Sequence, residues 1–210
     1  MKKAMAFVMA LVMSMLCASV MAEDVEKQVY TSPAKSYTIT VPGDWLCVDK
    51  TNIDAYIEAY EKGEMTFSGT NAMTLESLKP QITSADCAVL INPYANNVVI
   101  VKEAIGLTLT NDTFVSMMIP LLKQQLTSQM PAIEFTAEGE RLTLGDKEFV
   151  LLAAEYSLNG ITASVDMLFY LDGSALYTLN LTTTPLFGQD VVNAFYADVQ
   201  EACATFQVLE

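Results

Sequence analysis

The chain has 210 residues, enough for one domain with a sizeable core, and its 25 acidic and 11 basic residues give a net charge of -14. This charge repels phosphate backbones and anionic membrane surfaces, so we exclude nucleic-acid binding. The chain contains no histidine, which excludes Ser-His-Asp and Cys-His nucleophile systems and histidine-containing zinc sites.

The first 22 residues have the layout of a secretory signal peptide: two lysines precede an uncharged run over residues 4–22, and acidic residues follow. We expect cleavage after Ala22 and a mature chain, 23–210, that forms one domain. The domain would be secreted or held in the periplasm or cell envelope. Two alternatives stay open. The run is just long enough to remain in a membrane as an anchor, and Cys17 is a candidate for lipidation.

The amino-terminal half of the domain mixes short strands and helices. We predict strands over residues 28–32 and 36–42, a helix over 51–63 capped by Thr51 or Asn52, and a loop over 65–84 with a short helix at 75–79. Two β-rich runs, 86–93 and 96–104, carry apolar residues on both faces, which is typical of central strands. The turn residues between these runs predict a hairpin.

The longest predicted helix covers residues 110–130. Its apolar residues recur at helical spacing and form a stripe that we expect to be buried: Phe114, Met117, Met118, Leu121, Leu122, Leu126 and Met130. Pro120 lies inside the helix, removes one backbone hydrogen bond and should kink it.

Residues 134–184 predict an antiparallel meander. A two-residue turn at Asn159-Gly160 sets apolar residues against each other, for example Leu152 against Met167. For the next hairpin we predict a three-residue loop over 171–173, because this loop pairs Met167 with Tyr177. A closing helix follows over residues 189–204, with six side chains predicted to face inward: Val191, Val192, Phe195, Val199, Ala202 and Cys203.

The opposite face of the meander is polar, and we expect either water or a partner to cover it. It is our predicted site for a ligand or partner and consists of Glu155, Ser157, Thr162, Ser164, Asp166, Thr178, Asn180 and Thr182.

The sequence offers few chemical motifs. It contains no nucleophile elbow, phosphate loop, Cys-x-x-Cys pair or EF-hand spacing, so we expect neither a metal nor a cofactor. The carboxylate pairs Glu138 with Glu140 and Asp54 with Glu58 keep a histidine-free hydrolase open as an alternative.

Three cysteines follow the predicted cleavage site, so at most one internal disulfide can form. We expect the three to be small buried apolar residues. The alternative is one disulfide, for which Cys47 and Cys203 are the predicted pair.

The stretch YTITVPGDW, a strand that runs into Pro-x-x-Trp, resembles the entry motif of PsbP-like domains and of their structural relatives, the Mog-type Ran-binding proteins. The matched positions are Tyr37, Val41, Pro42 and Trp45. The pattern extends to the long central helix, to the meander and to the closing helix that ends at Phe206.

The resemblance implies an α+β fold, an antiparallel sheet sandwiched by helices, used as a binding or assembly module and generally without catalysis. It carries over no functional residue, because the matched positions are ones that the fold itself needs. We therefore expect Trp45 to fold back over the edge of the sheet and close the core, where burial of an aromatic ring is strongly favourable.

Our leading hypothesis is an exported bacterial module that binds another envelope or extracellular protein, or a small ligand, without catalysis. Besides the hydrolase, a membrane-tethered structural protein remains an alternative. The amino terminus of the mature chain distinguishes it, since only cleavage leaves Glu23 there.

Overall fold

The structure is a computed structural model that describes residues 26–70, 72–158 and 160–209. The predicted signal peptide, its cleavage after Ala22 and the lipidation alternative at Cys17 lie outside these residues. Within them, no helix has both the length and the apolar character needed to span a membrane.

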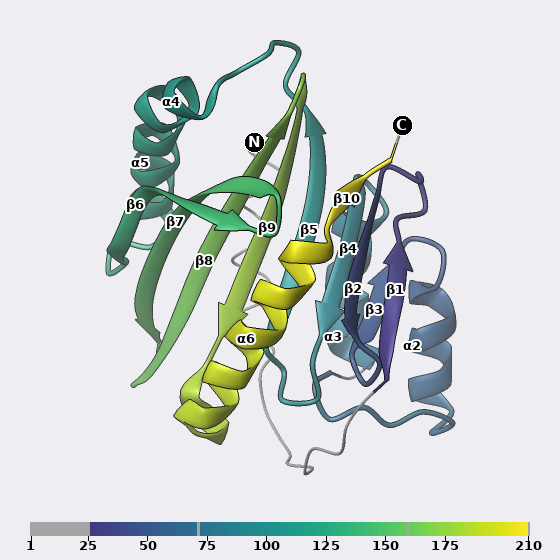
Figure 1. Cartoon of the computed structure of the whole chain (residues 1–210). Coiled ribbons are helices and arrows are strands. Elements are labelled where there is room, and N and C mark those ends of the chain that lie inside the picture. Colours follow the sequence, from purple (N-terminus) through teal and green to yellow (C-terminus); the bar gives the residue numbers. More distant parts are fainter. Residues whose placement is uncertain (1–25, 71, 159, 210) are drawn as a thin grey trace.

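Two antiparallel sheets form the fold, and helices lie on both faces of the larger one (Figure 1). The larger sheet has the order β3-β4-β5-β9-β8-β7-β6, with β3 (Leu46–Asp49), β4 (Asp86–Ile91), β5 (Asn97–Ala104), β6 (Glu134–Leu144), β7 (Lys147–Leu158), β8 (Ile161–Asp172) and β9 (Ala175–Thr183). The smaller sheet has the order β1-β2-β10, with β1 (Lys27–Thr31), β2 (Tyr37–Pro42) and β10 (Gln207–Val208). The helices are α2 (Ile53–Glu61), α3 (Ala72–Ile82), α4 (Asn111–Thr113), the π-helix η1 (Phe114–Met118), α5 (Ile119–Gln129), the 3-10 helix η2 (Pro185–Phe187) and α6 (Gln189–Thr205).

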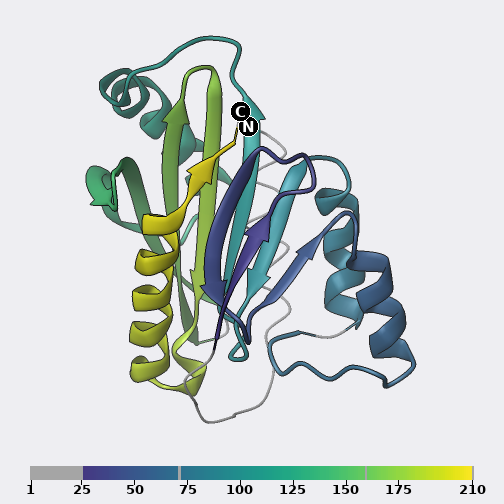
Figure 2. The same cartoon turned by 45° about the vertical axis from the view of Figure 1, so that its right-hand side comes forward.

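The two faces of the large sheet have different covers. On one face, α2 and α3 pack on β3 to β5, and α5 packs on β7 and β8. On the other face, α6 and the small sheet lie side by side (Figure 2). The predicted α+β class and the helices on both faces are confirmed, but a small second sheet, which we did not predict, shares the second face with α6.

The motif that ends in Trp45 packs as predicted. Along β2 the side chains of Tyr37, Ile39 and Val41 are buried while the residues between them are half-buried, as expected for a strand with one face on the core. The indole of Trp45 is 5% exposed. It stacks on the ring of Phe195 from α6, with ring centroids 5.4 Å apart and planes 11° from parallel. Trp45 therefore closes the core between the strand motif and α6.

Most of the amino-terminal predictions hold. The β4–β5 hairpin forms and both of its strands are buried on both faces. The helix α2 lies within the predicted range, but Asn52 does not cap it through its side chain, which instead bonds the N–H of Asp49 and the carbonyl of Cys47. Strand β3 was not predicted, and α3 is longer than the predicted short helix at both ends, beginning at Ala72 and running through Pro80 to Ile82.

The predicted apolar stripe of the long helix is partly wrong, because a π-helical turn interrupts it. The N–H of Ile119 bonds the carbonyl of Phe114, five residues back. This wider turn lies where the ring of Pro120 would otherwise clash with the carbonyl four residues earlier. The inserted residue rotates the rest of the helix by about 100°. Ile119 is consequently buried, whereas Met117 and Leu121 are 60% and 55% exposed.

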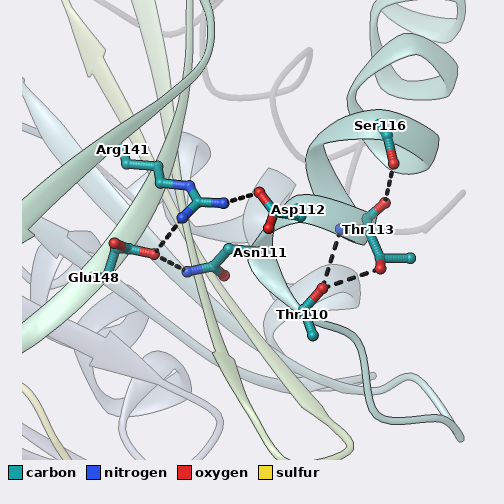
Figure 3. A network of polar contacts seen from close by, with 7 residues as sticks. All are labelled: Thr110, Asn111, Asp112, Thr113, Ser116, Arg141 and Glu148. Atoms are coloured by element: carbon teal, nitrogen blue, oxygen red, sulfur yellow. Dashed lines mark hydrogen bonds and ion pairs between the residues drawn. The ribbon is translucent and has the colours of Figure 1, made fainter.

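A polar network ties the start of this helix to the edge of the large sheet (Figure 3). Arg141 on β6 bonds Asp112 of α4 and lies 3.5 Å from Glu148 of β7, which also accepts a bond of 2.5 Å from the Asn111 side chain. Thr110 caps α4 by accepting from the N–H of Thr113. The Arg141 charge is balanced by two carboxylates, so we assign this network a structural role.

The β7–β8 hairpin has the predicted register, with Leu152 opposite Met167 and Tyr156 opposite Ala163. The β8–β9 register that we predicted is wrong. The chain turns at residues 173–174, so Met167 faces Asn180 rather than Tyr177. The prediction assumed that apolar residues of β9 would all share the face of Met167. However, β9 is a central strand that is buried on both faces, so this test does not fix its register.

The three described cysteines are free thiols, as expected, and the alternative disulfide between Cys47 and Cys203 is not formed. Cys203 and Cys87 are buried and Cys47 is half-buried. Burial raises the pKa of the Cys47 and Cys203 thiols to about 12, which makes them unreactive at neutral pH.

Candidate functional site

A cavity of about 510 Å³ lies between α6 and the face of β6 to β9 that α6 covers. Its volume is within the range of small-molecule and side-chain binding pockets. The lining mixes carboxylates, hydroxyls and apolar groups: Thr136, Ala137, Leu151, Ala153, Glu155, Thr162, Ser164, Asp166, Thr183, Pro185, Gln189, Val192 and Tyr196. We call it the α6 cavity.

The alternation of the strands explains which side chains reach the α6 cavity. On β8, Ala163, Val165 and Met167 are buried toward α5, so Ser164 and Asp166 point to the α6 side. Glu155 of β7 lies directly opposite Ser164 and therefore shares its face. The result is one wall of the cavity with two carboxylates and a hydroxyl between them.

An irregularity in β6 completes the cavity on one side. The pairing of β6 with β7 shifts between Phe135 and Ala137, which leaves Thr136 as an extra residue. Both Thr136 and Ala137 line the cavity as a result. Bulges commonly redirect side chains in this way beside binding sites.

The helix α6 supplies Tyr196, the central side chain of the opposite wall. Its phenol interacts with the carboxyl of Asp166 on β8 and with the hydroxyls of Ser164 and Thr183, and these groups all line the α6 cavity. A carboxylate only accepts hydrogen bonds, so the Tyr196 hydroxyl is the donor in its interaction with Asp166. The site is thus a four-residue polar cluster that joins β8, β9 and α6.

Burial sets the electrostatics of this cluster. Desolvation raises the pKa of the Asp166 carboxyl above its ordinary value, the hydrogen bond from Tyr196 opposes this shift, and the charge of Glu155 adds to it. The pKa of Tyr196 is also raised, chiefly by burial and then by the neighbouring Asp166 charge. The ionised form of Asp166 is therefore less stable here than it would be in water.

Solved structures resemble the fold of this chain, although no family model and no curated protein sequence matches it. CyanoP, the cyanobacterial PsbP of Synechocystis, matches with a TM-score of 0.50 and 14% identity over 92% of this chain and 98% of its own. The chain has the PsbP/Mog fold.

Two further structures with the PsbP/Mog fold match at lower scores. LpqN of Mycobacterium tuberculosis, described as involved in cell envelope biogenesis, matches with a TM-score of 0.46 and 12% identity. The match covers 90% of this chain and 93% of LpqN. The Ran-binding protein Mog1p of Saccharomyces cerevisiae matches with a TM-score of 0.44 and 11% identity. The match covers 89% of this chain and 97% of Mog1p. At these identities the likeness concerns the fold alone.

Half of the predicted polar face belongs to the α6 cavity of this PsbP/Mog fold. Glu155, Thr162, Ser164 and Asp166 line it. Ser157 lies just outside, where its hydroxyl is 3.0 Å from that of Thr162 and both residues are exposed.

The other three predicted residues, Thr178, Asn180 and Thr182, were placed on the wrong face. Through the β8–β9 register they share the face of Phe169, Met167 and Val165, which α5 covers, and all three are buried.

The α6 cavity also contains three polar residues that we did not predict, which come from α6 and the end of β9: Thr183, Gln189 and Tyr196. The signal for Tyr196 was present. It is a Tyr placed directly after Phe195 on a helix whose inward positions are otherwise apolar, and such a residue sits at the border of the buried stripe.

The carboxylate pairs that we considered for hydrolysis do not form a site. Glu138 is bound to Lys123, Asp54 to Lys79 and Glu58 to Lys62, all on the surface. Across residues 26–70, 72–158 and 160–209, no group of three or more His, Cys, Asp or Glu side chains is placed to hold a metal ion.

A second cavity, of about 440 Å³, lies on the other side of α6 beside Trp45. Its lining includes Asp44 and Asp198, whose carboxyl pKa values are raised by burial first, with Asp198 raised further by neighbouring acidic charges. Lys27 also lines it but is bound to Glu201. Trp45 lines this cavity too, but it is 5% exposed and one face of its ring is covered by Phe195, so little of the indole is free to stack on a ligand.

Proposed function

We propose that this protein is an exported, non-catalytic binding or assembly module of the bacterial envelope or extracellular space, and that it holds its partner through the α6 cavity. The observation that carries the proposal is the α6 cavity itself, whose lining brings the carboxylates of Glu155 and Asp166 and the phenol of Tyr196 together with apolar side chains. The PsbP/Mog fold supports a binding role, and the signal-peptide layout of residues 1–22 supports export.

The arrangement of carboxylates favours binding over hydrolysis. Glu155 and Asp166 are diagonal neighbours on adjacent strands, a relation in which residues lie about 7–8 Å apart and their Cβ atoms somewhat closer. Glycosidases hold their two carboxyl groups roughly 5–10 Å apart, so the pair keeps the hydrolase as a second candidate. However, glycosidase carboxylates stand on opposite sides of the scissile bond, whereas these two lie side by side on one wall.

A partner-capture experiment tests the binding function. The full chain is expressed in a bacterial host with a carboxy-terminal tag, recovered by cross-linking and analysed by quantitative mass spectrometry. Thr162→Trp adds a large side chain to the lining of the cavity, and Thr143→Trp, at another exposed threonine that lies on β6 and does not line the cavity, is the matched control. We expect the same specific partner with the wild type and the control and its loss with Thr162→Trp. A protein recovered alone, or capture unchanged by Thr162→Trp, contradicts the proposal.

The same preparation tests export and the alternatives. Amino-terminal sequencing should give Glu23, whereas an intact Met1 would favour the membrane-tethered alternative. The wild-type protein should hydrolyse a panel of nitrophenyl glycosides no faster than the Asp166→Asn variant does. Turnover that disappears in both Asp166→Asn and Glu155→Gln would replace the binding function with the hydrolase.

A further inference from the structure

The charged side chains that line the α6 cavity are all acidic. Two of its lining residues, Glu155 and Asp166, carry carboxylates, and none of the described lining residues is a lysine or arginine. The protein as a whole carries a net charge of -14. An anionic ligand would therefore meet repulsion both from the cavity wall and from the molecule around it.

Asp166 has hydrogen-bonding capacity that the protein does not use. An ionised carboxylate offers about four acceptor positions. Tyr196 is the one hydrogen-bond donor identified for it among the described residues, and burial otherwise penalises its charge. A donor that carries a positive charge would relieve this penalty, because an ion pair is stronger in a partly buried site than in water.

The surrounding groups suit an ammonium in particular. An ammonium has three donors, and the hydroxyl oxygens of Ser164 and Thr162 and the amide oxygen of Gln189 line the same cavity as Asp166. A metal ion such as calcium takes six to eight oxygen ligands, and among the described residues no group of three or more His, Cys, Asp or Glu side chains is placed to hold one.

The apolar lining indicates what the ammonium is attached to. Leu151, Ala153 and Val192 line the cavity together with the carboxylates. Aliphatic carbon placed against these side chains is removed from water, which stabilises the complex by about 0.8 kcal/mol per methylene. A ligand that fills both regions has an alkyl chain ending in a charged amine.

We propose that the α6 cavity binds an alkylammonium group with Asp166 as its counter-ion. This inference rests on the proposed function, since it names the chemistry through which the module recognises its partner. The alkylammonium belongs either to a lysine side chain of a partner protein or to a free small amine.

Three probes of equal chain length test the inference on the purified exported protein: hexylamine, hexanol and hexanoate. Affinities are measured by NMR titration or calorimetry. We expect hexylamine to bind at least tenfold more tightly than hexanol, and hexanoate not to bind. Equal affinity for the three probes, or tighter binding of hexanoate, would overturn the inference.

The variant Asp166→Asn keeps the size of the side chain and removes its charge. We expect it to weaken hexylamine binding at least tenfold and to leave hexanol unchanged. Asp172→Asn, the same substitution at an exposed position of the same strand, should bind hexylamine like the wild type. If Asp166→Asn fails to fold, the probe series on the wild type still decides. If it folds and binds hexylamine normally, Asp166 is not the counter-ion.

The source of the amine is resolved by a second arm, in which the peptide acetyl-Gly-Lys-Gly-amide is compared with hexylamine. Tighter binding of the peptide identifies a lysine of a protein partner, and tighter binding of hexylamine identifies a free amine. Binding of calcium that Asp166→Asn abolishes, without binding of either amine, would make the site a metal site and overturn the inference.

The two proposals can fail separately. Loss of partner capture in Thr162→Trp without any amine binding refutes the ligand class but keeps the binding function. If the amine binds but Thr162→Trp leaves partner capture unchanged, the proposed function is refuted instead.

Discussion

Replacement of Trp45 by alanine tests whether this residue closes the core. The side chain is 5% exposed and stacks on Phe195. A buried aromatic side chain removes roughly 150–250 Å² from water, which corresponds to roughly 4–6 kcal/mol at about 25 cal/mol per Å². Measured Phe and Trp truncations in cores cost about 3–5 kcal/mol, so we expect Trp45→Ala to lower the free energy of unfolding by about 4 kcal/mol.

Urea denaturation followed by circular dichroism measures this loss, because the variant lacks the one tryptophan that fluorescence would report. A loss of about 4 kcal/mol should lower Tm by roughly 8–16 °C in a domain of this size. Trp45→Phe keeps a ring against Phe195 and should cost about 1–2 kcal/mol. Val29→Ala, at a residue 69% exposed, should change stability by less than about 0.5 kcal/mol.

The reasoning would be refuted by a Trp45→Ala protein that unfolds like the wild type. If such a variant also lost its partner, Trp45 would be a ligand-binding surface and its stacking on Phe195 would be incidental. A double-mutant cycle between Trp45 and Phe195 separates the stack from simple burial, and we expect a coupling energy of about 0.5–1.5 kcal/mol.

Three further predictions concern the helix, a turn and the site. Ile119→Ala should cost about 2–5 kcal/mol in urea denaturation and the exposed Leu121→Ala less than about 0.5 kcal/mol; equal losses would mean that the π-helical turn is absent. Gly145→Ala should destabilise more than Gly173→Ala, because both residues have positive φ but a Cβ on Gly145 would lie 2.7 Å from the carbonyl oxygen of Ala204, and equal melting of the two variants would contradict this packing. Burial raises the folded-state pKa of Asp166, so ionisation of this carboxyl costs the folded protein more free energy than it costs the unfolded chain. This cost is absent below the unfolded pKa and is complete once the pH has risen through the folded pKa. Asp166→Asn should therefore be more stable than the unliganded wild type at pH 7, and the difference should vanish below the unfolded pKa of about 3.9; a variant less stable at pH 7 would show that Asp166 is not desolvated.

Local patterns predicted the parts of the fold in which a single cause dominates. The β7–β8 register followed from the Asn159-Gly160 turn and from the apolar pairs that it creates. The position of Trp45 followed from strand alternation and from the motif it ends. In both cases one face of the strand is clearly apolar, so the sequence has one low-energy arrangement.

The errors arose where two requirements compete. On β9 both faces are buried, so polar residues such as Asn180 carry no information about which face meets water. In the long helix, the geometry required by Pro120 outweighs the regular apolar spacing and turns Met117 outward. Neither outcome can be derived from residue spacing alone, because each depends on the neighbouring elements.

The candidate site was half predictable for the same reason. Strand alternation found Ser164 and Asp166, since they are consecutive polar positions on one strand face. Tyr196 and Thr183 come from other elements, and only the packing of α6 on the sheet brings them to Asp166. Predicting that contact would require the position of α6 on the sheet.

Site-specific photo-crosslinking tests the central claim, that a partner occupies the α6 cavity, most directly. A benzoylphenylalanine replaces either Gln189, which lines the cavity, or Gln124, an exposed glutamine on α5. The account predicts that the partner captured by the wild type is cross-linked from position 189 and not from position 124. Cross-linking from position 124 alone would place the partner on the opposite face of the sheet and contradict the account.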